Sequence, residues 1–406
     1  MDGQDTFTEV TNQSWGSRLV GSIKSVLIGI VLFLISFIVL WYNEGRAVKT
    51  ATGLEQGASQ VITVDSGELI QENSGKLVHL TGKVVTKENL TDEDFKIDVN
   101  AIKLRRNVYM YQWVEKKERK KEKKIGGGEK TTTTYRYEKR WENNVINSTN
   151  FRKPNGHTNP KSLLHAKYSH TVSNATIGKY NLSKSLLSQA GGFEPLAITT
   201  LDTLKHKNAR IISEGSNSSG SSNTLTKKVY IGKGTSSSPQ IGDVKVSFDI
   251  IASGNDYSII SQQNGATFNA FQTNTGTTIN IISEGVLSSE NMFATAQKNN
   301  TILTWILRAV GFFMMFFGLS MILKPLVILA DVLPFLGSIL DFGLILFVGI
   351  ISFGLSFITI ALAWLAYRPL LGVLLLVVGG GVIGFILFRK SKKTKIAKSV
   401  KVIENT

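Results

Sequence analysis

The sequence has 406 residues, no cysteine and a formal net charge of +16. The length allows a membrane region together with one or two soluble domains, and the lack of cysteine excludes disulfides, cysteine-ligated metal sites and thiol catalysis. The basic residues gather in two stretches, 103–140 and 389–403, which argues against a general nucleic-acid-binding surface.

The first apolar run covers residues 25–42 and follows a segment, 1–24, that we expect to be a cytoplasmic tail. A helix over this run would be ~27 Å long, close to the thickness of the hydrocarbon core. A secretory signal peptide is the alternative, but residues 43–46 lack a small-residue cleavage motif. We therefore predict a retained transmembrane helix with Trp41 and Tyr42 at one interface.

Residues 43–301 form the predicted soluble domain, in which short alternating runs and turn signals favour β structure. Clear strand patterns occur at 76–85 and 243–251, with another candidate at 280–282. Short helices are expected at 159–170, where Asn and Pro suit a helix start, and at 183–190. The Ser-rich stretch 213–222 reads as a flexible loop.

A long β-hairpin is predicted within this domain, because 108–114 and 131–141 both alternate aromatic with other residues. Tyr111 and Trp113 lie in its first strand. The tip would be the lysine-rich stretch 116–124, which could touch anionic lipid headgroups or an acidic partner. A solvated, mobile loop is the alternative.

Three further apolar runs, 302–323, 342–367 and 370–388, follow the soluble domain and complete a prediction of four transmembrane helices. Arg308 lies in the first of them and could extend its guanidinium to the membrane surface. Between the last two runs stand only Arg368 and a proline, which indicates a tight antiparallel hairpin.

Residues 324–341 are expected to form an interfacial loop, with a fifth span as the alternative. In the last run, Gly380 and Gly384 form a G-x-x-x-G pair that would permit close helix packing. The basic stretch that follows, 389–406, is predicted to be cytoplasmic. Four spans then place both termini in the cytoplasm and export the domain 43–301.

Several stretches resemble the LUMA family, also called transmembrane protein 43. The most specific is 99–115, with Leu-Arg-Arg at 104–106 and the run Met-Tyr-Gln-Trp-Val-Glu at 110–115. Further matching stretches are 43–52, 75–79, 146–148, 150–151, 156–157, 159–160, 307–309 and 367–370. They occur in the same order across most of the chain.

The resemblance implies four spans, a large domain in a lumen or its equivalent, and a scaffolding role in membrane organisation. Animal members of the family reside in the endoplasmic reticulum and inner nuclear membrane and associate with lamins and emerin. A bacterial member would lie in the cytoplasmic membrane. Because no catalytic activity is established for the family, the resemblance supplies no active-site residues.

No motif of a serine hydrolase, P-loop, zinc protease or kinase occurs in the sequence. His157, His165 and His170 lack a metal-ligand spacing, so we predict neither a metal site nor a cofactor. Asp331 and Asp341 could be functional intramembrane acids or could mark the ends of the interfacial loop.

Six residues are candidates for interaction or for the membrane interface: Glu44, Arg46, Tyr111, Trp113, Arg308 and Arg368. Glu44 and Arg46 follow the first span and could form an ion pair that fixes the domain against the bilayer, or could simply anchor the interface.

The sequence as a whole predicts an α-helical multi-pass membrane protein with a large β-rich α+β extramembrane domain. The expected function is a non-enzymatic scaffold that binds membrane lipids and other membrane proteins, with a homo-oligomer possible and no nucleic acid involved. A channel or transporter subunit is the first alternative, and a lipid-acting membrane enzyme is the second.

Overall fold

The computed structural model describes residues 5–198, 208–215, 225–332, 334–370 and 373. The chain divides into two compact units. The first, here called the β domain, comprises Met1–Asn12, Gly53–Glu122 and Glu129–Ala296. The second, the helical unit, comprises Gln13–Thr52, Lys123–Gly128 and Gln297–Thr406. A large β-rich domain and a set of apolar helices are thus both present.

The described elements alternate between these units along the chain. The α-helices are α1 (Trp15–Gln60), α2 (Lys184–Gln189), α3 (Ser289–Ala330) and α4 (Pro334–Tyr367). The strands are β1 (Thr6–Gln13), β2 (Ile62–Thr63), β3 (Leu77–Val85), β4 (Leu90–Asp92), β5 (Ile97–Val99), β6 (Ala101–Lys123), β7 (Glu129–Glu142), β8 (Tyr168–Thr171), β9 (Thr176–Ile177), β10 (Tyr180–Asn181), β11 (Glu194–Pro195), β12 (Ala209–Gly215), β13 (Leu225–Ile231), β14 (Val244–Ala252), β15 (Asp256–Asn264), β16 (Thr267–Asn269), β17 (Phe271–Gln272), β18 (Thr278–Ile279) and β19 (Ile281–Glu284).

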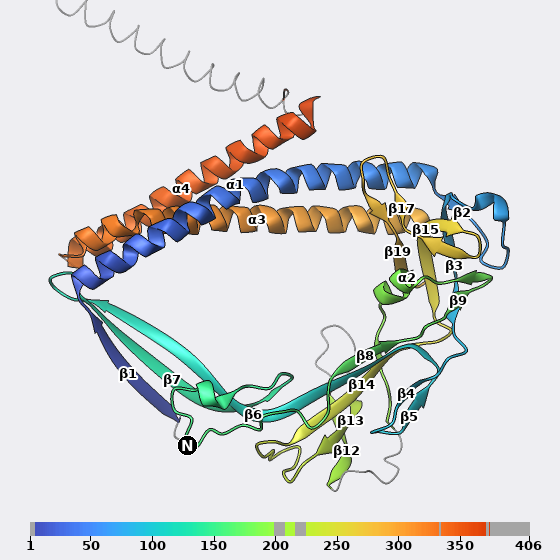
Figure 1. Ribbon diagram of the computed structural model, residues 1–406, viewed down its shortest axis with the longest axis horizontal. Coiled ribbons are helices and arrows are strands. Elements are labelled where there is room, and N and C mark those ends of the chain that lie inside the picture. The colour runs from blue at the N-terminus through green and yellow to red at the C-terminus, as the bar shows by residue number, and fades with distance from the viewer. Residues whose placement is uncertain (1–4, 199–207, 216–224, 333, 371–372, 374–406) are drawn as a thin grey trace, which may run out of the picture. The chain divides into compact units, whose positions relative to one another are not determined.

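Two main sheets build the β domain around one hydrophobic core (Figure 1). Within the described residues, the larger sheet follows the order β1-β7-β6-β14-β13-β12, with β11 paired to β14 and β8 paired to β6. The smaller follows β10-β9-β3-β15-β16, with β19 paired to β15 and β2 paired to β3. Leu80 of β3 and Val246 of β14 are both fully buried in the same core. Because alternate side chains of a strand point to one face, each sheet contributes one apolar face to this core.

The predicted β-hairpin exists as β6 and β7, but it reverses later than expected. β6 continues through the lysine-rich stretch to Lys123, so the turn comprises residues 124–128 and not 116–124. Gly126 and Gly127 have φ angles of 84° and 77°, a region that favours glycine. The turn forms where glycine permits it, and opposite charges on the two strands keep the lysine-rich stretch extended. These cross-strand ion pairs are Lys116–Glu138 and Lys121–Glu129.

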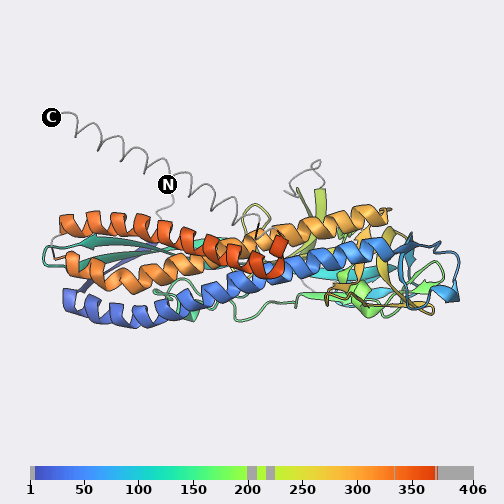
Figure 2. The ribbon, with the colours of Figure 1, turned by 90° about the horizontal axis from the view of Figure 1, so that it is seen from above.

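Three described helices are long and apolar enough to cross a membrane: α1, α3 and the Phe342–Tyr367 part of α4. α1 has 46 residues, or a length of ~69 Å. α1 and α3 run side by side in both views (Figures 1 and 2). Where Gly29 of α1 faces α3, a Cβ added to Gly29 would lie 2.7 Å from the carbonyl oxygen of Gly318. The two glycines therefore allow the helices to pack backbone against backbone.

Several local predictions are confirmed. The expected strands at 76–85, 243–251 and 280–282 correspond to β3, β14 and β19, and the short helix at 183–190 corresponds to α2. The hydroxyl of Ser183 accepts the Leu186 N–H at 3.4 Å and so caps the start of α2.

The predicted helix at 159–170 is wrong. The Asn159 side chain accepts the Trp113 N–H at 2.7 Å and donates to the Trp113 carbonyl at 2.9 Å. Because this amide hydrogen-bonds to a strand far away in the sequence, it does not cap a helix, and β8 begins at Tyr168.

The boundaries around the apolar runs also differ from the prediction. Within the predicted tail 1–24, the described residues contain β1 and the start of α1. The expected interfacial loop, 324–341, is mostly helical, since α3 continues to Ala330 and α4 begins at Pro334. In an apolar stretch, a helix provides internal hydrogen-bond partners for the backbone N–H and C=O groups. Pro325 lacks an N–H and so removes only one of the hydrogen bonds within α3.

The predicted fourth span, 370–388, lies outside the described residues except for 370 and 373. The predicted basic tail, 389–406, and the pair Gly380 and Gly384 also lie outside them. So does most of the predicted Ser-rich loop, and the side chain of Asp341 is likewise not described.

Candidate functional site

A buried carboxylate joins the three apolar helices of the helical unit. Glu44 lies on α1, and its side chain is 2% exposed. Arg308 of α3 donates from Nε to Glu44 Oε1 at 2.7 Å and from Nη2 to Oε2 at 2.8 Å. The indole Nε1 of Trp364, on α4, donates to Oε2 at 2.7 Å. The bidentate arrangement is the stronger geometry for an arginine–carboxylate pair. Together with the Trp364 hydrogen bond, it links α1, α3 and α4 at one point.

Aromatic rings cover the Arg308 guanidinium. Its central carbon lies 4.7 Å from the ring centroid of Trp305 and 5.7 Å from that of Trp364. At these distances the guanidinium makes cation–π interactions with both rings. Such interactions are stronger where water is excluded. The sequence suggested that Arg308 reaches outward to a membrane surface; the structure directs it inward to a carboxylate.

A second polar layer lies next to the Glu44 cluster. The sequence suggested a pair between Glu44 and Arg46, but Arg46 donates to Asn300 Oδ1 at 2.9 Å and to Thr304 Oγ1 at 3.0 Å. Asn300 in turn donates to the carbonyl of Ala47 at 3.0 Å. Hydrogen bonds between side chains thus continue the contact of α1 with α3 beyond the ion pair.

The end of α4 packs directly on α1. A Cβ added to Gly45 would lie 2.6 Å from the ring of Tyr367, so a larger residue at position 45 would require that ring to shift. Tyr367 also lies 6.0 Å from the ring of Trp41. The predicted interface residue Arg368 follows immediately, has an exposed side chain, and donates its N–H to the Trp364 carbonyl at 2.6 Å.

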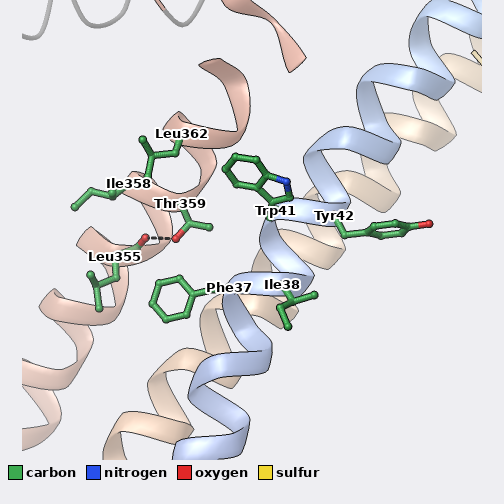
Figure 3. Close-up of a pocket in the computed structure, with 8 residues that line it drawn as sticks. All are labelled: Phe37, Ile38, Trp41, Tyr42, Leu355, Ile358, Thr359 and Leu362. Atoms are coloured by element: carbon green, nitrogen blue, oxygen red, sulfur yellow. Dashed lines mark hydrogen bonds between the residues drawn. The ribbon is translucent and has the colours of Figure 1, made fainter. Parts of the chain in front are cut away.

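An apolar groove of about 460 Å³ runs between α1 and α4 (Figure 3). The hydroxyl of Thr359 donates to the carbonyl of Leu355 at 2.7 Å, so it is satisfied within its own helix. The groove is therefore suited to apolar groups such as acyl chains or another helix. Its lining comprises Phe37, Ile38, Trp41, Tyr42, Leu355, Ile358, Thr359 and Leu362.

A second buried acid, Asp331, lies just beyond the end of α3, and its side chain is 0% exposed. Arg18 of α1 contacts its Oδ2 at 2.6 Å, and Lys123 contacts its Oδ1 at 2.7 Å. Arg18 also donates to the carbonyl of Gly127 at 2.5 Å. Two cations thus neutralise the acid that the sequence singled out, and one of them comes from the end of β6.

Tyr111 and Trp113 form part of an aromatic row on the β6–β7 hairpin, which we define as Tyr111, Trp113 and Trp141. The ring of Tyr111 lies 5.3 Å from that of Trp141. Lys139 stands 4.8 Å over Trp113, and Lys245 stands 4.1 Å over Trp141. All three rings are partly exposed. Aromatic rings of this kind, flanked by cations, are enriched at protein interfaces.

His157 packs behind the row. Its ring stacks on Tyr137 with centroids 3.9 Å apart, and its Nε2 lies 2.7 Å from Asp5 Oδ2. Tyr137 donates to Glu115 at 2.8 Å. Burial, together with this bond to a carboxylate, raises the pKa of Tyr137 to about 12. These contacts give His157 a packing role, and no group of three acidic or histidine side chains among the described residues is placed to hold a metal ion.

Comparison with known sequences identifies the family. The sequence model described as "Transmembrane protein 43" matches residues 110–369, well over half of the chain. The chain belongs to the transmembrane protein 43 family. This confirms the resemblance to the LUMA family noted from the sequence.

Curated members of the transmembrane protein 43 family match nearly the whole chain. Transmembrane protein 43 of Pongo abelii is 33% identical over 92% of this chain and 90% of its own length. The Homo sapiens protein is 33% identical over 88% of each. A Drosophila melanogaster homolog is 28% identical over 87% of this chain and 91% of its own length. No solved structure matches.

Sequence reasoning missed the partners that complete the two charged centres of this family member. Trp364 is one of several aromatic residues in the apolar runs, and Lys123 is one of many lysines in its stretch, so neither stood out in the sequence. A usable signal existed for Glu44 and Arg308, because unlike charges at the edges of two apolar runs are costly unless paired. This reasoning would have predicted the pair of Glu44 and Arg308, but not the contribution of Trp364 from α4.

Proposed function

We propose that this protein is a non-enzymatic membrane scaffold, anchored by its apolar helices and binding other membrane proteins through the β domain. The aromatic row carries the proposal. Tyr111, Trp113 and Trp141 present partly exposed rings beside lysines, on a hairpin whose strands are fixed in an eight-stranded sheet. Rigid aromatic groups with cationic neighbours are the residues that dominate binding energy at protein interfaces.

The anchor supports the same proposal. The Glu44–Arg308–Trp364 cluster holds α1, α3 and α4 together with its charge neutralised internally. Such a cluster suits a fixed anchor better than an ion path, which needs polar groups facing an open route. We include the apolar run 370–388 in the proposed anchor as a fourth membrane helix. A eukaryotic member would act in the endoplasmic reticulum or inner nuclear membrane, and a bacterial one in the cytoplasmic membrane.

Photo-crosslinking in cells tests the proposal. A photo-reactive amino acid replaces Tyr111, and a matched variant carries it at Lys87, which is exposed elsewhere on the β domain. We expect Tyr111 to give specific adducts with other membrane proteins that Lys87 does not give. Adducts with lipid or with the chain itself alone would contradict the scaffold, and the second case would favour a homo-oligomer.

A flux assay separates the scaffold from the alternative function of a channel subunit. The purified full chain in liposomes is expected to show no ion flux above that of protein-free liposomes. Flux that disappears on substituting residues of the apolar helices would overturn the scaffold proposal.

A further inference from the structure

The larger sheet of the β domain has an outer face, opposite its hydrophobic core, on which aromatic and basic side chains alternate. On β6, Val108 and Met110 belong to the core, so Tyr109 between them points to the outer face. Lys245 of β14 and Tyr230 of β13 point outward for the same reason, because the residues on either side of each belong to the core. The period of the strands therefore decides which side chains this face presents.

Backbone pairing brings these side chains into a ladder across β6, β14, β13 and β12, which lie next to one another in Figure 1. Tyr109 pairs with Lys245, and Lys245 pairs with Tyr230. Tyr230 in turn pairs with Arg210 of β12, whose guanidinium carbon lies 4.2 Å from the Tyr230 ring centroid. The ladder therefore alternates ring and cation, at a spacing that lets a cation lie over a ring.

The ladder is continuous with the aromatic row. The ring of Trp141 lies 5.9 Å from that of Tyr230, at an angle of 75°. Tyr230 is fully buried beneath its neighbours, whereas Tyr109 is 38% exposed. We call the accessible part of this surface the basic aromatic face, which comprises Tyr109, Tyr111, Trp113, Lys139, Trp141 and Arg210.

The basic aromatic face carries positive charge that nearby carboxylates do not neutralise. Glu214, beside it on β12, is shared between two lysines: it contacts Lys228 at 3.0 Å and also contacts Lys245. Lys139 lies over the Trp113 ring, and Arg210 donates to a backbone carbonyl. In the part of the chain that the structure describes, neither of these two cations is in an ion pair. An acidic partner would therefore complement this face.

The width of the face favours an extended segment over a compact anion. Lys139 lies on β7 and Arg210 on β12, and the order β7-β6-β14-β13-β12 separates them by ~19 Å across the sheet. One phosphate group cannot reach both cations, whereas about six residues of extended chain can. A nucleic-acid strand has a phosphate at every nucleotide and binds where cations follow its backbone. Here rings separate the cations, which matches a segment with apolar residues between its acids.

We propose that the basic aromatic face binds an extended acidic segment of a partner membrane protein, in which glutamate or aspartate residues are interspersed with apolar ones. The carboxylates of the segment pair with Lys139 and Arg210, and its apolar side chains contact the exposed rings. This inference rests on the proposed scaffold function and adds the chemistry of the partner.

Binding of a synthetic peptide tests the inference. The probe is a dye-labelled peptide of alternating glutamate and leucine, and the control peptide has glutamine in place of every glutamate. Fluorescence anisotropy measures the binding of each to the full chain in nanodiscs of zwitterionic lipid. We expect the glutamate peptide to bind about tenfold more tightly, and less tightly as salt screens the charges. Equal binding of the two peptides, or binding of neither, would overturn the inference.

Charge reversal locates the binding surface. Lys139→Glu and Arg210→Glu should each weaken binding of the glutamate peptide by about tenfold. Lys87→Glu is the matched control, because Lys87 is exposed elsewhere on the β domain. Thermal unfolding shows whether each variant is folded, and the exposed position of Lys139 keeps the test valid if Arg210→Glu does not fold. Unchanged binding by folded Lys139→Glu would overturn the inference.

Competition and crosslinking distinguish the other classes of partner. Displacement of the peptide by a single-stranded oligonucleotide or by phosphatidylserine vesicles that bind more tightly would overturn the inference in favour of nucleic acid or anionic lipid. Tyr111 adducts with membrane proteins at segments without acidic residues would overturn it while leaving the scaffold function intact. A lack of membrane-protein adducts at Tyr111, with the glutamate peptide still bound, would contradict the scaffold instead.

Discussion

The β domain and the helical unit distribute polar and apolar groups in opposite ways. Leu80 and Val246 of the β domain are 0% exposed, and its lysine-rich strand is outside. In the helical unit, Leu34 is 56% and Ile350 is 71% exposed, whereas Glu44 is 1% exposed. The contrast shows that the first unit is built for water and the second for hydrocarbon, where apolar surface costs nothing and a charge must be paired internally.

The largest expected loss of stability comes from removing one partner of the ion pair that is buried in the helical unit. Glu44→Ala leaves the Arg308 guanidinium without its carboxylate, and removing one partner of a buried pair costs about 3–5 kcal/mol. Thermal unfolding of the full chain in nanodiscs, with hydrogen exchange of the α1 amides, measures the loss.

The control for that variant removes both charges. The double variant Glu44→Leu with Arg308→Met leaves no unpaired ion, and we expect it to recover most of the stability lost in Glu44→Ala. If the double variant were as unstable as the single one, the ion pair would not be the reason for the loss.

A matched pair of leucines sharpens the comparison between the units. Leu80→Ala opens a cavity in a fully buried core and should cost about 2–5 kcal/mol. Leu34→Ala, on the exposed surface of α1, should cost under about 0.5 kcal/mol in lipid. The readout is local hydrogen exchange in β3 and in α1. Equal losses at the two sites would show that Leu34 packs against protein, contrary to the lipid-facing assignment.

The glycine contact between α1 and α3 should be less costly to disturb. Gly29→Leu forces a side chain against the backbone at Gly318, and we expect a loss of about 1–3 kcal/mol. The control is Gly21→Leu on the same helix, because a Cβ at Gly21 meets nothing within 4 Å. Thermal unfolding in nanodiscs should separate the two variants; identical melting curves would rule out a close approach at Gly29.

The smallest effect is a pH dependence confined to the β domain. Burial lowers the pKa of His79 from 6.5, and its hydrogen bond with the Leu287 carbonyl opposes this only in part. Because the unfolded ring takes up its proton at a higher pH than the folded ring, its stabilising contribution is complete above pH 6.5. That contribution is lost as the pH falls below 6.5 towards the folded pKa.

The variant His79→Gln should flatten this part of the stability profile, because glutamine carries no proton that titrates in this range. Denaturant unfolding between about pH 5 and 7 measures it. His170→Gln is the control, since His170 is exposed. An unchanged slope in His79→Gln would show that another group causes the dependence.

Local patterns predicted much of the fold correctly. Alternation placed β3 and β14, and Ser183 with the residues after it placed α2, because these elements follow from side-chain periodicity and capping. The prediction of a helix at 159–170 was wrong because the Asn159 side chain hydrogen-bonds to Trp113 of β6, 46 residues away. No local sequence pattern reveals such a contact. The hairpin tip was misplaced because its lysines signalled a loop, whereas cross-strand ion pairs keep them in β6.

By itself, the sequence determined that the protein has apolar helices, a β-rich domain and membership of the transmembrane protein 43 family, since hydropathy, alternation and motifs are properties of neighbouring residues. Only the tertiary structure decided that Glu44 pairs with Arg308 and Trp364, that Asp331 joins Arg18 and Lys123, and that β1 belongs to the large sheet. Each of these contacts joins residues far apart in the chain. They form because a charge in hydrocarbon or an unpaired strand must find a partner wherever the fold brings one close.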